Sequence, residues 1–324
     1  MEKQGVFYAV SVGPGDPELL TRQACRVLEA CDIIAAPRMK SGRMLALDIA
    51  AGAVDMQGKT VLPLDFTMAR NAAVREDSYR TAAAAIKAEL AAGRDVAMVN
   101  LGDVSVYATA YYILERIRAD GFETVMCPGV TSFCAVAARL GRSLTRMEEP
   151  LHILPGSAEL DSALALPGTK VIMKSGKAIH ETAAALAAGR DVAMVNLGDV
   201  SVYATAYYIL ERIRADGFET VMCPGVTSFC AVAARLGRSL TRMEEPLHIL
   251  PGSMDMDSAL TLEGTKVLMK SGRAIRETVD ALERHGLAAR AGMVADCGLE
   301  TEQVYTDLRQ LPEEISYFAT IVAD

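Results

Sequence analysis

The chain of 324 residues is long enough for about two ordinary domains, and its 51% hydrophobic and 23% charged residues exclude an intrinsically disordered protein. The formal net charge of −8, from 33 basic and 41 acidic side chains, argues against broad nucleic-acid binding. The longest apolar stretch, residues 125–138, contains Pro128 and Gly129 and is too short to span a membrane.

Apolar runs alternate with helical patterns along the chain, which predicts an α/β fold with mostly parallel strands. Strands are expected near residues 6–12, 32–36, 60–64, 95–100 and 123–126, with helices at 17–29, 72–90 and 106–119. A second series follows, with strands near 151–154, 169–173, 291–295 and 316–322 and a helix near 177–188. Two α/β units that meet near residue 150 would enclose a cleft, which is a favoured place for a small ligand.

A long internal repeat occupies the middle of the chain. Residues 90–157 recur letter for letter as residues 186–253, at an offset of 96, and 17 of the next 25 positions also match. Since the identity extends through ordinary surface residues that packing would not fix, it indicates a duplication within a 228-residue design and not a solenoid.

The repeat sets the expected domain organisation. The simplest assignment is an N-terminal domain at 1–150, a surplus duplicated segment at 151–246 and a C-terminal domain at 247–324. The surplus segment is then expected to be looped out and loosely packed, or to swap into another chain. Alternatively the first sheet accepts the second copy, and residues 90–185 become the insertion.

The first motif is Ser11–Thr21 (SVGPGDPELLT), which follows the first expected strand and opens a helix. Its glycines let the backbone approach a ligand closely, and Asp16 is suited to cap a helix that begins at Pro17. It is not a dinucleotide fingerprint, because the position of the third glycine holds Glu18. A capped turn and a ligand-binding loop both remain open.

The second motif is Asn100–Thr109 (NLGDVSVYAT), which recurs at Asn196–Thr205. It places the carboxylate of Asp103 and backbone N–H groups at the end of a strand, where open α/β sheets bind their ligands. The alternative is a helix cap at Asp103, worth about 1 kcal/mol.

The third motif is Cys127–Phe133 (CPGVTSF), which recurs at residues 223–229 and also follows a strand. The hydroxyls of Thr131 and Ser132 are suited either to cap the next helix or to bind a ligand. Taken alone, the motif is explained most simply by capping.

The fourth motif, Val171–Gly176 (VIMKSG), has its counterpart at Val267–Gly272 (VLMKSG). It ends a strand with a methionine followed by a lysine, which places a soft apolar group beside a cation at the edge of a cleft. A core methionine beside a lysine whose amine reaches solvent is the simpler explanation of this motif alone.

Cysteines and histidines add no metal motif to these loops. The seven cysteines include no CxxC pair and the four histidines no HExxH pattern, so we expect no metal site. Buried thiols in a reducing cytoplasm are the simplest interpretation of the cysteines.

Together and in this order, the four motifs resemble the tetrapyrrole (corrin/porphyrin) methylase family, whose members bind S-adenosylmethionine between two α/β domains. The resemblance covers essentially the whole chain once one repeat is removed. Residues 149–156, the Met-Lys-Ser-Gly strand end and residues 311–318 look most like the C20-methyltransferases of precorrin-2 and cobalt-factor II. The chain departs from the family where proline usually follows Gly-Asp, since Val104 and Val200 stand there; a softer loop and weaker cofactor binding are expected.

The resemblance implies a role for each matching position. The implied contacts of S-adenosylmethionine are Pro14, Leu101, Gly102, Asp103, Val106, Thr131, Ser132 and Met269, with Met173 as the counterpart of Met269. Asp103 and Tyr107, together with Asp16, are the candidate groups for removing a proton. Because methyl transfer to an electron-rich ring carbon needs no metal and no covalent enzyme intermediate, the protein's task is mainly positioning.

The tetrapyrrole ring carries several carboxylates, which an acidic protein must neutralise locally. Arg38, Lys40 and Arg43, clustered after the second expected strand, are the candidates because guanidinium groups bind carboxylates well. A solvated loop of charges is the alternative.

Other functions compete with that of a C20-methyltransferase. They are another tetrapyrrole C-methyltransferase of the family, a folded but inactive duplication product, and a nucleotide-binding oxidoreductase. The last is disfavoured because Pro37 and Arg38 occupy the place of the ribose-binding acid. The family resemblance implies a homodimer, while the charge, the apolar stretches and the cysteines predict a cytoplasmic protein without nucleic-acid or membrane partners.

Overall fold

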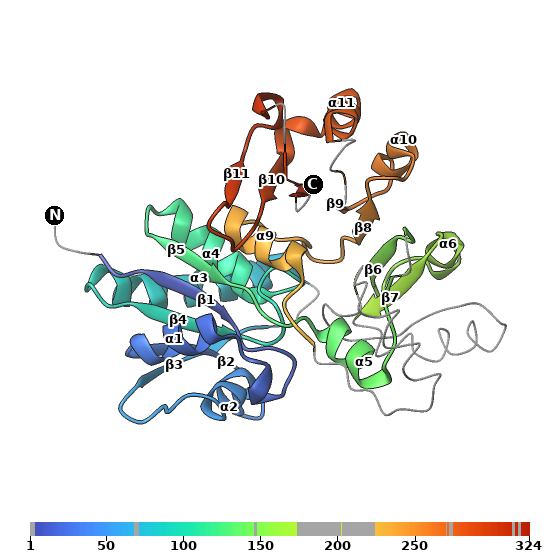
Figure 1. The fold of residues 1–324 in the computed structure, drawn as a ribbon. Helices are drawn as coiled ribbons and strands as arrows, with labels where there is room; N and C mark the ends of the chain where they lie inside the picture. Colours follow the sequence, from blue (N-terminus) through green and yellow to red (C-terminus); the bar gives the residue numbers. More distant parts are fainter. Residues whose placement is uncertain are drawn as a thin grey trace. The chain divides into compact units, whose positions relative to one another are not determined.

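The computed structural model describes residues 4–67, 71–145, 148–173, 202, 224–269, 271, 275–312, 315–316 and 319–324. The chain divides into two compact units, Met1–Thr131 and Ser132–Asp324, and each unit is built on its own sheet (Figure 1). The border thus lies earlier in the chain than the expected position near residue 150. The helix expected near residues 177–188 lies outside the described residues.

The first unit contains a five-stranded parallel sheet in the order β3-β2-β4-β1-β5. The strands are β1 (Phe7–Ser11), β2 (Ile33–Arg38), β3 (Thr60–Asp65), β4 (Val96–Asn100) and β5 (Thr124–Cys127). The apolar runs predicted these strands to within two residues at each end. β1 and β4 are buried almost throughout, as expected for parallel strands covered on both faces.

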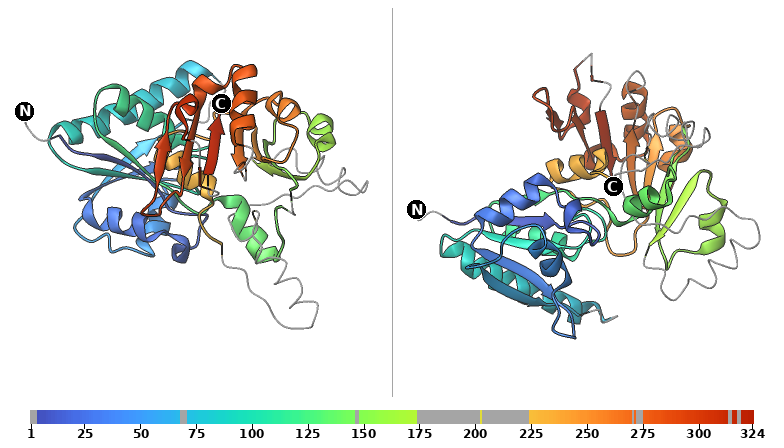
Figure 2. Two further views of the ribbon diagram at one scale, coloured as in Figure 1. Left: turned by 45° about the horizontal axis from the view of Figure 1, so that its top comes forward. Right: turned by 60° about the horizontal axis from the view of Figure 1, so that its bottom comes forward.

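Helices cover both faces of this sheet (Figures 1 and 2). They are η1 (Pro17–Leu19), α1 (Arg22–Ala30), α2 (Leu45–Ala51), α3 (Ala72–Ala91) and α4 (Thr109–Ala119). On one face α1 and α2 pack Leu28 and Ile49 into a cluster with Val10 and Ile34 of the sheet. On the other face α3 and α4 pack against each other and against the central strands.

Two helices differ from their predicted bounds for local reasons. The helix expected at 17–29 is divided into η1 and α1, because the Thr21 hydroxyl accepts a hydrogen bond from the Ala24 N–H at 3.0 Å and starts a new helix. The helix expected at 106–119 begins only at Thr109, because Tyr107 has a φ of +49°, a left-handed conformation that an α-helix excludes.

The second unit contains a seven-stranded mixed sheet in the order β11-β10-β12-β9-β8-β6-β7. Its strands are β6 (Leu151–Pro155), β7 (Thr169–Met173), β8 (Leu247–Pro251), β9 (Thr265–Met269), β10 (Ala291–Ala295), β11 (Gln303–Tyr305) and β12 (Ala319–Ala323). Its helices are α5 (Ser132–Leu140), α6 (Leu160–Ala165), α9 (Ser228–Leu236), α10 (Met256–Leu260), α11 (Ile275–Arg284), η3 (Ala288–Arg290) and η4 (Leu308–Gln310). An apolar core joins α10 and α11 to β9, β10 and β12.

Both copies of the repeat contribute to this second sheet. The unit β6-α6-β7 comes from the first copy and β8-α10-β9 from the second, and each pairs its two strands in parallel in the same register. β6 also pairs with β8. The expectation that the surplus segment would be looped out is therefore wrong for β6 and β7, because these apolar strands are buried by extending the sheet.

Candidate functional site

The sheet order of the first unit brings three of the sequence motifs to one edge. β1 lies between β4 and β5, and all three strands are parallel. The loops that follow them contain the first, second and third motifs, so the three loops emerge side by side at the carboxyl ends of the strands. This edge is where open α/β sheets bind ligands.

Two glycines join the loops after β1 and β4. The Gly102 N–H donates a hydrogen bond to the Gly13 carbonyl oxygen at 2.7 Å, which extends the pairing of the two strands by an isolated bridge. Gly13 has a φ of +70° and Gly102 a φ of +75°, a region that other residues rarely adopt. The two loops therefore need glycine at both positions to meet in this way.

Asp103 connects the loop after β4 to the loop after β5. Its side chain is buried, with 2% of the residue exposed, and its Oδ2 accepts a hydrogen bond from the Gly129 N–H at 2.7 Å. Its Oδ1 accepts hydrogen bonds from the Ser105 N–H at 2.8 Å and from the Ser105 hydroxyl. The carboxylate thus holds its own loop and the neighbouring loop together.

Ser11 completes the connection from the end of β1. Its hydroxyl accepts a hydrogen bond from the Val104 N–H at 2.9 Å. A Cβ added to Gly129 would lie 2.4 Å from the Cβ of Ser11 and 3.1 Å from the carbonyl oxygen of Gly102. Because real Cβ atoms do not approach other atoms so closely, the third loop can pack here only with glycine at position 129.

Thr131 carries a buried hydroxyl without a partner. The residue is 1% exposed, and its Oγ1 makes no hydrogen bond within the part of the chain that the structure describes. Thr227 holds the same place in the second copy, but its hydroxyl accepts a hydrogen bond from the Cys230 N–H at 3.4 Å and caps α9. The capping predicted for this motif therefore occurs at Thr227, whereas the buried Thr131 hydroxyl has no partner among the described residues.

We call Ser11, Gly13, Gly102, Asp103, Gly129 and Thr131 the strand-end cluster. Three of these residues, Gly102, Asp103 and Thr131, were candidates from the sequence. Ser11, Gly129 and the supporting residue Ser105 lie inside the quoted motifs but were not singled out. Only the strand order β4-β1-β5 shows that Ser11 contacts the loop after β4, so no local sequence signal could have identified it.

The remaining candidates of these loops lie at the same edge. Pro14 is half-buried and Val106 is buried, whereas Leu101 is 48% exposed. Tyr107 is half-buried, and its left-handed φ is the kind of local strain that clusters at functional sites. Asp16 caps η1 by accepting a hydrogen bond from the Glu18 N–H at 3.0 Å, which confirms the predicted cap.

The three basic candidates lie at the end of β2, where Arg38 is its last residue, and in the loop after it; β2 is the neighbour of β4 on its other side. Arg38 forms a two-pronged ion pair with Asp65 at the end of β3, with its Nε 2.9 Å from Oδ1. This guanidinium lowers the pKa of the Asp65 carboxyl. Arg43 pairs with Asp48 at 2.8 Å, and Lys40 is exposed. All of these groups face solvent and are accessible to an anionic ligand.

Met269 and Ser132 belong to the second unit. Met269 ends β9, and its carbonyl oxygen accepts a hydrogen bond from the Gly252 N–H at 2.7 Å; the first copy repeats this contact between Gly156 and Met173. Ser132 is the first residue of α5. Lys174 and Lys270 of the fourth motif lie outside the described residues.

The buried thiols of the first unit are chemically quiet. Burial raises the pKa of Cys31 to about 11 and that of Cys127 to about 12, so both remain protonated at neutral pH. In the described ranges, no three His, Cys, Asp or Glu side chains are grouped so as to hold a metal ion. None of the helices that the structure describes is both long and apolar enough to cross a bilayer.

The parallel sheet, with three glycine-containing loops joined at the carboxyl ends of its strands, defines an α/β protein whose candidate ligand site lies at this edge. The sequence profile of the Tetrapyrrole (Corrin/Porphyrin) Methylases matches residues 6–189 and again residues 178–312. The chain therefore belongs to this family, as the motifs predicted. The two overlapping matches are consistent with the internal duplication.

Three relatives illustrate the similarity. The chain is 36% identical over 174 residues to cobalt-precorrin-2 C(20)-methyltransferase of Salmonella typhimurium, which covers 52% of this chain and 73% of that protein. It is 32% identical over 197 residues to precorrin-2 C(20)-methyltransferase of a Sinorhizobium species, a region that covers 57% of this chain and 79% of that protein. It is 28% identical over 141 residues to the S-adenosyl-L-methionine-dependent uroporphyrinogen III methyltransferase of Arabidopsis thaliana. This region covers 44% of this chain and 35% of that protein.

Proposed function

We propose that this chain is an S-adenosylmethionine-dependent C-methyltransferase that acts on C20 of precorrin-2 or of its cobalt-bearing counterpart in cobalamin biosynthesis. The proposal rests on the similarity to cobalt-precorrin-2 C(20)-methyltransferase. This chain is 36% identical to that protein over a region that covers 73% of its length. Another member of the family with a different ring position is the alternative, and the position of the methyl group on the product distinguishes the two.

The strand-end cluster fits a ligand such as S-adenosylmethionine. This molecule presents an ammonium, a carboxylate and two ribose hydroxyls, and the unpartnered hydroxyl of Thr131 is suited to bind one of them. Gly13 and Gly102 lack the Cβ atoms that would keep a ligand away from the backbone. When bound, S-adenosylmethionine supplies an electrophilic methyl group.

The task of the protein in this reaction is to hold two reactants in line. Correct positioning of two bound molecules contributes roughly 7–11 kcal/mol to lowering the barrier. Asp103 was predicted to act as a base, but its two carboxylate oxygens hold Gly129 and Ser105, so we propose a positioning role for it. Tyr107, at the same edge, remains the candidate for this proton transfer, in which its phenolate form would accept the proton that the ring loses.

We propose that the exposed cations after β2 bind the carboxylates of the tetrapyrrole. Arg38 makes a two-pronged contact with the Asp65 carboxylate, and a substrate carboxylate would take the place of Asp65 in this geometry. Met269 and Ser132 remain predicted contacts of the cofactor. A homodimeric assembly and a cytoplasmic location also remain predictions, which light scattering and cell fractionation test.

Thr131→Val tests the cofactor site. Removing an unpartnered buried hydroxyl should raise the free energy of unfolding of the ligand-free chain by about 1 kcal/mol, and it should weaken S-adenosylmethionine binding roughly tenfold. Thr227→Val is a matched control in identical local sequence. It should destabilise the chain by about 1 kcal/mol through the lost cap and leave binding unchanged. Equal effects of both variants on binding would contradict the assignment of Thr131.

A further inference from the structure

The two copies of one strand pair with each other in the second sheet. β6 and β8 have the same sequence, Leu-His-Ile-Leu-Pro, and they run antiparallel with Leu151 opposite Ile249 and Ile153 opposite Leu247. His152 therefore lies opposite His248, the same residue of the other copy. This register places a local two-fold axis between the two histidines.

The side chains obey the same symmetry. Nδ1 of His152 lies 2.7 Å from Nδ1 of His248, and both residues are buried. Nε2 of His152 is 2.9 Å from the carbonyl oxygen of Pro167, and Nε2 of His248 is 2.9 Å from that of Glu263, the equivalent position of the second copy. Each copy thus presents the same surface to the other, which is the property of a two-fold interface between identical subunits.

The strand β8 needs such a partner. All five of its residues are buried, and Leu247, Ile249 and Leu250 are apolar. Without β6, β8 would be the edge of the sheet, because its other side pairs with β9. A buried and mostly apolar strand that is left at the edge of a sheet is a ready site for pairing with another chain.

We infer that β8 is a self-complementary docking edge whose partner is a second copy of the same strand, and that the tandem repeat supplies this copy within one chain. The duplication thereby converts a contact between two chains into a contact inside one. Freeing β8 from β6 should accordingly allow two chains to pair through their β8 strands.

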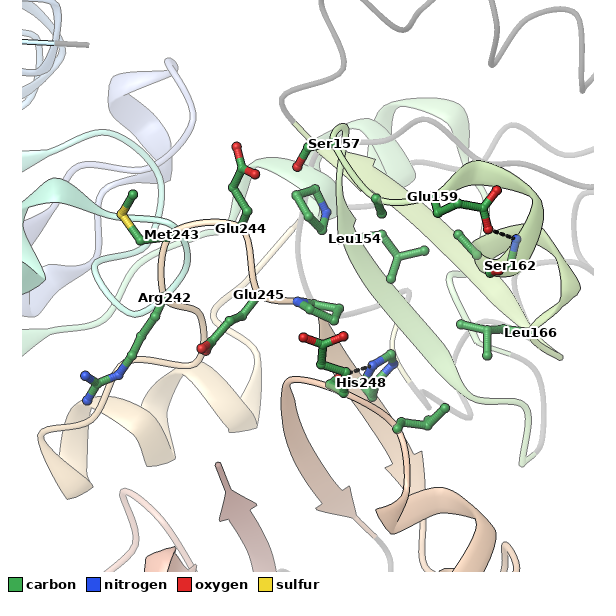
Figure 3. Close-up of a pocket in the computed structure, with 16 residues that line it drawn as sticks. Leu154, Ser157, Glu159, Ser162, Leu166, Arg242, Met243, Glu244, Glu245 and His248 are labelled. Atoms are coloured by element: carbon green, nitrogen blue, oxygen red, sulfur yellow. Dashed lines mark hydrogen bonds between the residues drawn. The ribbon is translucent and has the colours of Figure 1, made fainter. Parts of the chain in front are cut away.

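The contact between the copies depends on the strands. Beside them the structure leaves a pocket of about 590 Å³, with β6 and α6 on one side and residues 242–246 on the other (Figure 3). Leu154 and Leu166 line its apolar wall, whereas Glu244 and Glu245 lie on the opposite wall. Because the copies do not close over this space, disrupting the β6–β8 ladder should release one copy from the other.

A disulfide locates the pairing in the full chain. Residues directly opposite in antiparallel strands have Cα atoms about 4.5–5.5 Å apart, which suits a disulfide. Oxidised His152→Cys/His248→Cys protein should contain a link between positions 152 and 248 of the same chain and have the mass of a single chain under denaturing, non-reducing conditions. A link between those positions of different chains would show that the tandem copy does not occupy the edge and would overturn the inference.

A second variant tests the freed edge. Ile153→Pro removes a backbone donor from the middle of β6, and in combination with His248→Cys it should produce chains linked through position 248 of both, with doubled mass. Ile153→Val/His248→Cys is the matched control and should give no such link. The parent chain, oxidised in parallel, accounts for the partly exposed Cys25 and Cys297, and peptide mass mapping identifies the linked positions.

This test requires that the proline variant remains folded. Its helical circular dichroism measures whether it does. If it precipitates, Ile153→Asp replaces it, because a buried carboxylate opposite Leu247 also disrupts the ladder. The inference would be overturned if the folded Ile153→Pro/His248→Cys or Ile153→Asp/His248→Cys protein keeps the mass of a single chain and forms no link at position 248.

Discussion

The imidazole rings of His152 and His248 meet nearly at right angles with their Nδ1 atoms 2.7 Å apart, while each Nε2 lies 2.9 Å from a backbone carbonyl oxygen. A carbonyl oxygen only accepts hydrogen bonds, so each Nε2 must carry a proton, and the Nδ1 contact then needs a third proton. Burial, helped at His152 by the neighbouring ring, lowers the pKa of both histidines to about 4. At neutral pH the two neutral rings therefore carry two protons, one fewer than the three contacts require.

This pair should make the second unit sensitive to mild acid. Lys170 and Lys266 lie opposite the two histidines on the flanking strands, and they add positive charge that opposes protonation. The unfolded histidines bind protons near pH 6.5 and the folded ones only near pH 4, so the free energy of unfolding should fall as the pH is lowered between these values. This follows because the folded state binds these protons more weakly than the unfolded state does.

Urea unfolding followed by circular dichroism at pH 7, 6 and 5 measures this loss. The double variant His152→Leu/His248→Leu should show a shallower dependence on pH, because it lacks the buried rings. His285→Gln is the control, since it alters a partly exposed histidine that pairs with Asp257. Equal slopes for the parent and the double variant would refute the assignment of the acid sensitivity to this pair.

Gly129→Ala should disrupt the strand-end cluster. The added methyl group would lie 2.4 Å from the Cβ of Ser11, so the loop after β5 must shift, and we expect a loss of about 1–3 kcal/mol of stability. Binding of S-adenosylmethionine, measured by calorimetry, should weaken at least tenfold. Gly58→Ala meets no atom within 4 Å at a φ of +80° and should cost about 1 kcal/mol without affecting binding. Unchanged binding in Gly129→Ala would count against a ligand at this edge.

Asp103→Asn separates a positioning role from a base. The amide keeps the shape of the side chain but presents an NH₂ group to one of the two backbone N–H donors, so about 1–3 kcal/mol of stability should be lost. A positioning residue predicts weaker binding of S-adenosylmethionine and an unchanged pH profile of kcat. A base predicts unchanged binding, a fall in kcat of roughly 10²–10⁴ and a lost limb of the profile.

The sequence predicted the strands of the first sheet because long apolar runs bounded by glycine and proline are strong signals, as at residues 96–100. It could not distinguish the two copies. Thr131 and Thr227 have identical neighbours, yet one hydroxyl is unpartnered and the other caps a helix, because tertiary surroundings decide between the two. The pairing of β6 with β8 was likewise hidden, since each strand pattern indicates burial but not its partner.

The cations after β2 should affect the tetrapyrrole and not the cofactor. Arg38→Gln should raise KM for the ring roughly tenfold, because a two-pronged contact with a carboxylate is lost, and should leave S-adenosylmethionine binding unchanged. Its stability should change little, because the Arg38–Asp65 pair is exposed. Arg94→Gln, which removes an exposed ion pair with Glu89, is the control. An unaltered KM in Arg38→Gln, Lys40→Ala and Arg43→Gln alike would exclude this loop as the substrate contact.

The position of the transferred methyl group tests the proposed function most directly. The full chain is incubated with S-adenosylmethionine labelled with ¹³C in its methyl group, together with metal-free or cobalt-bearing precorrin-2, and the product is analysed by mass spectrometry and NMR. We predict a single labelled methyl group on C20, formed with one of the two rings in clear preference. Label on another carbon, or no transfer to either ring by a chain that binds S-adenosylmethionine, would contradict the proposed function.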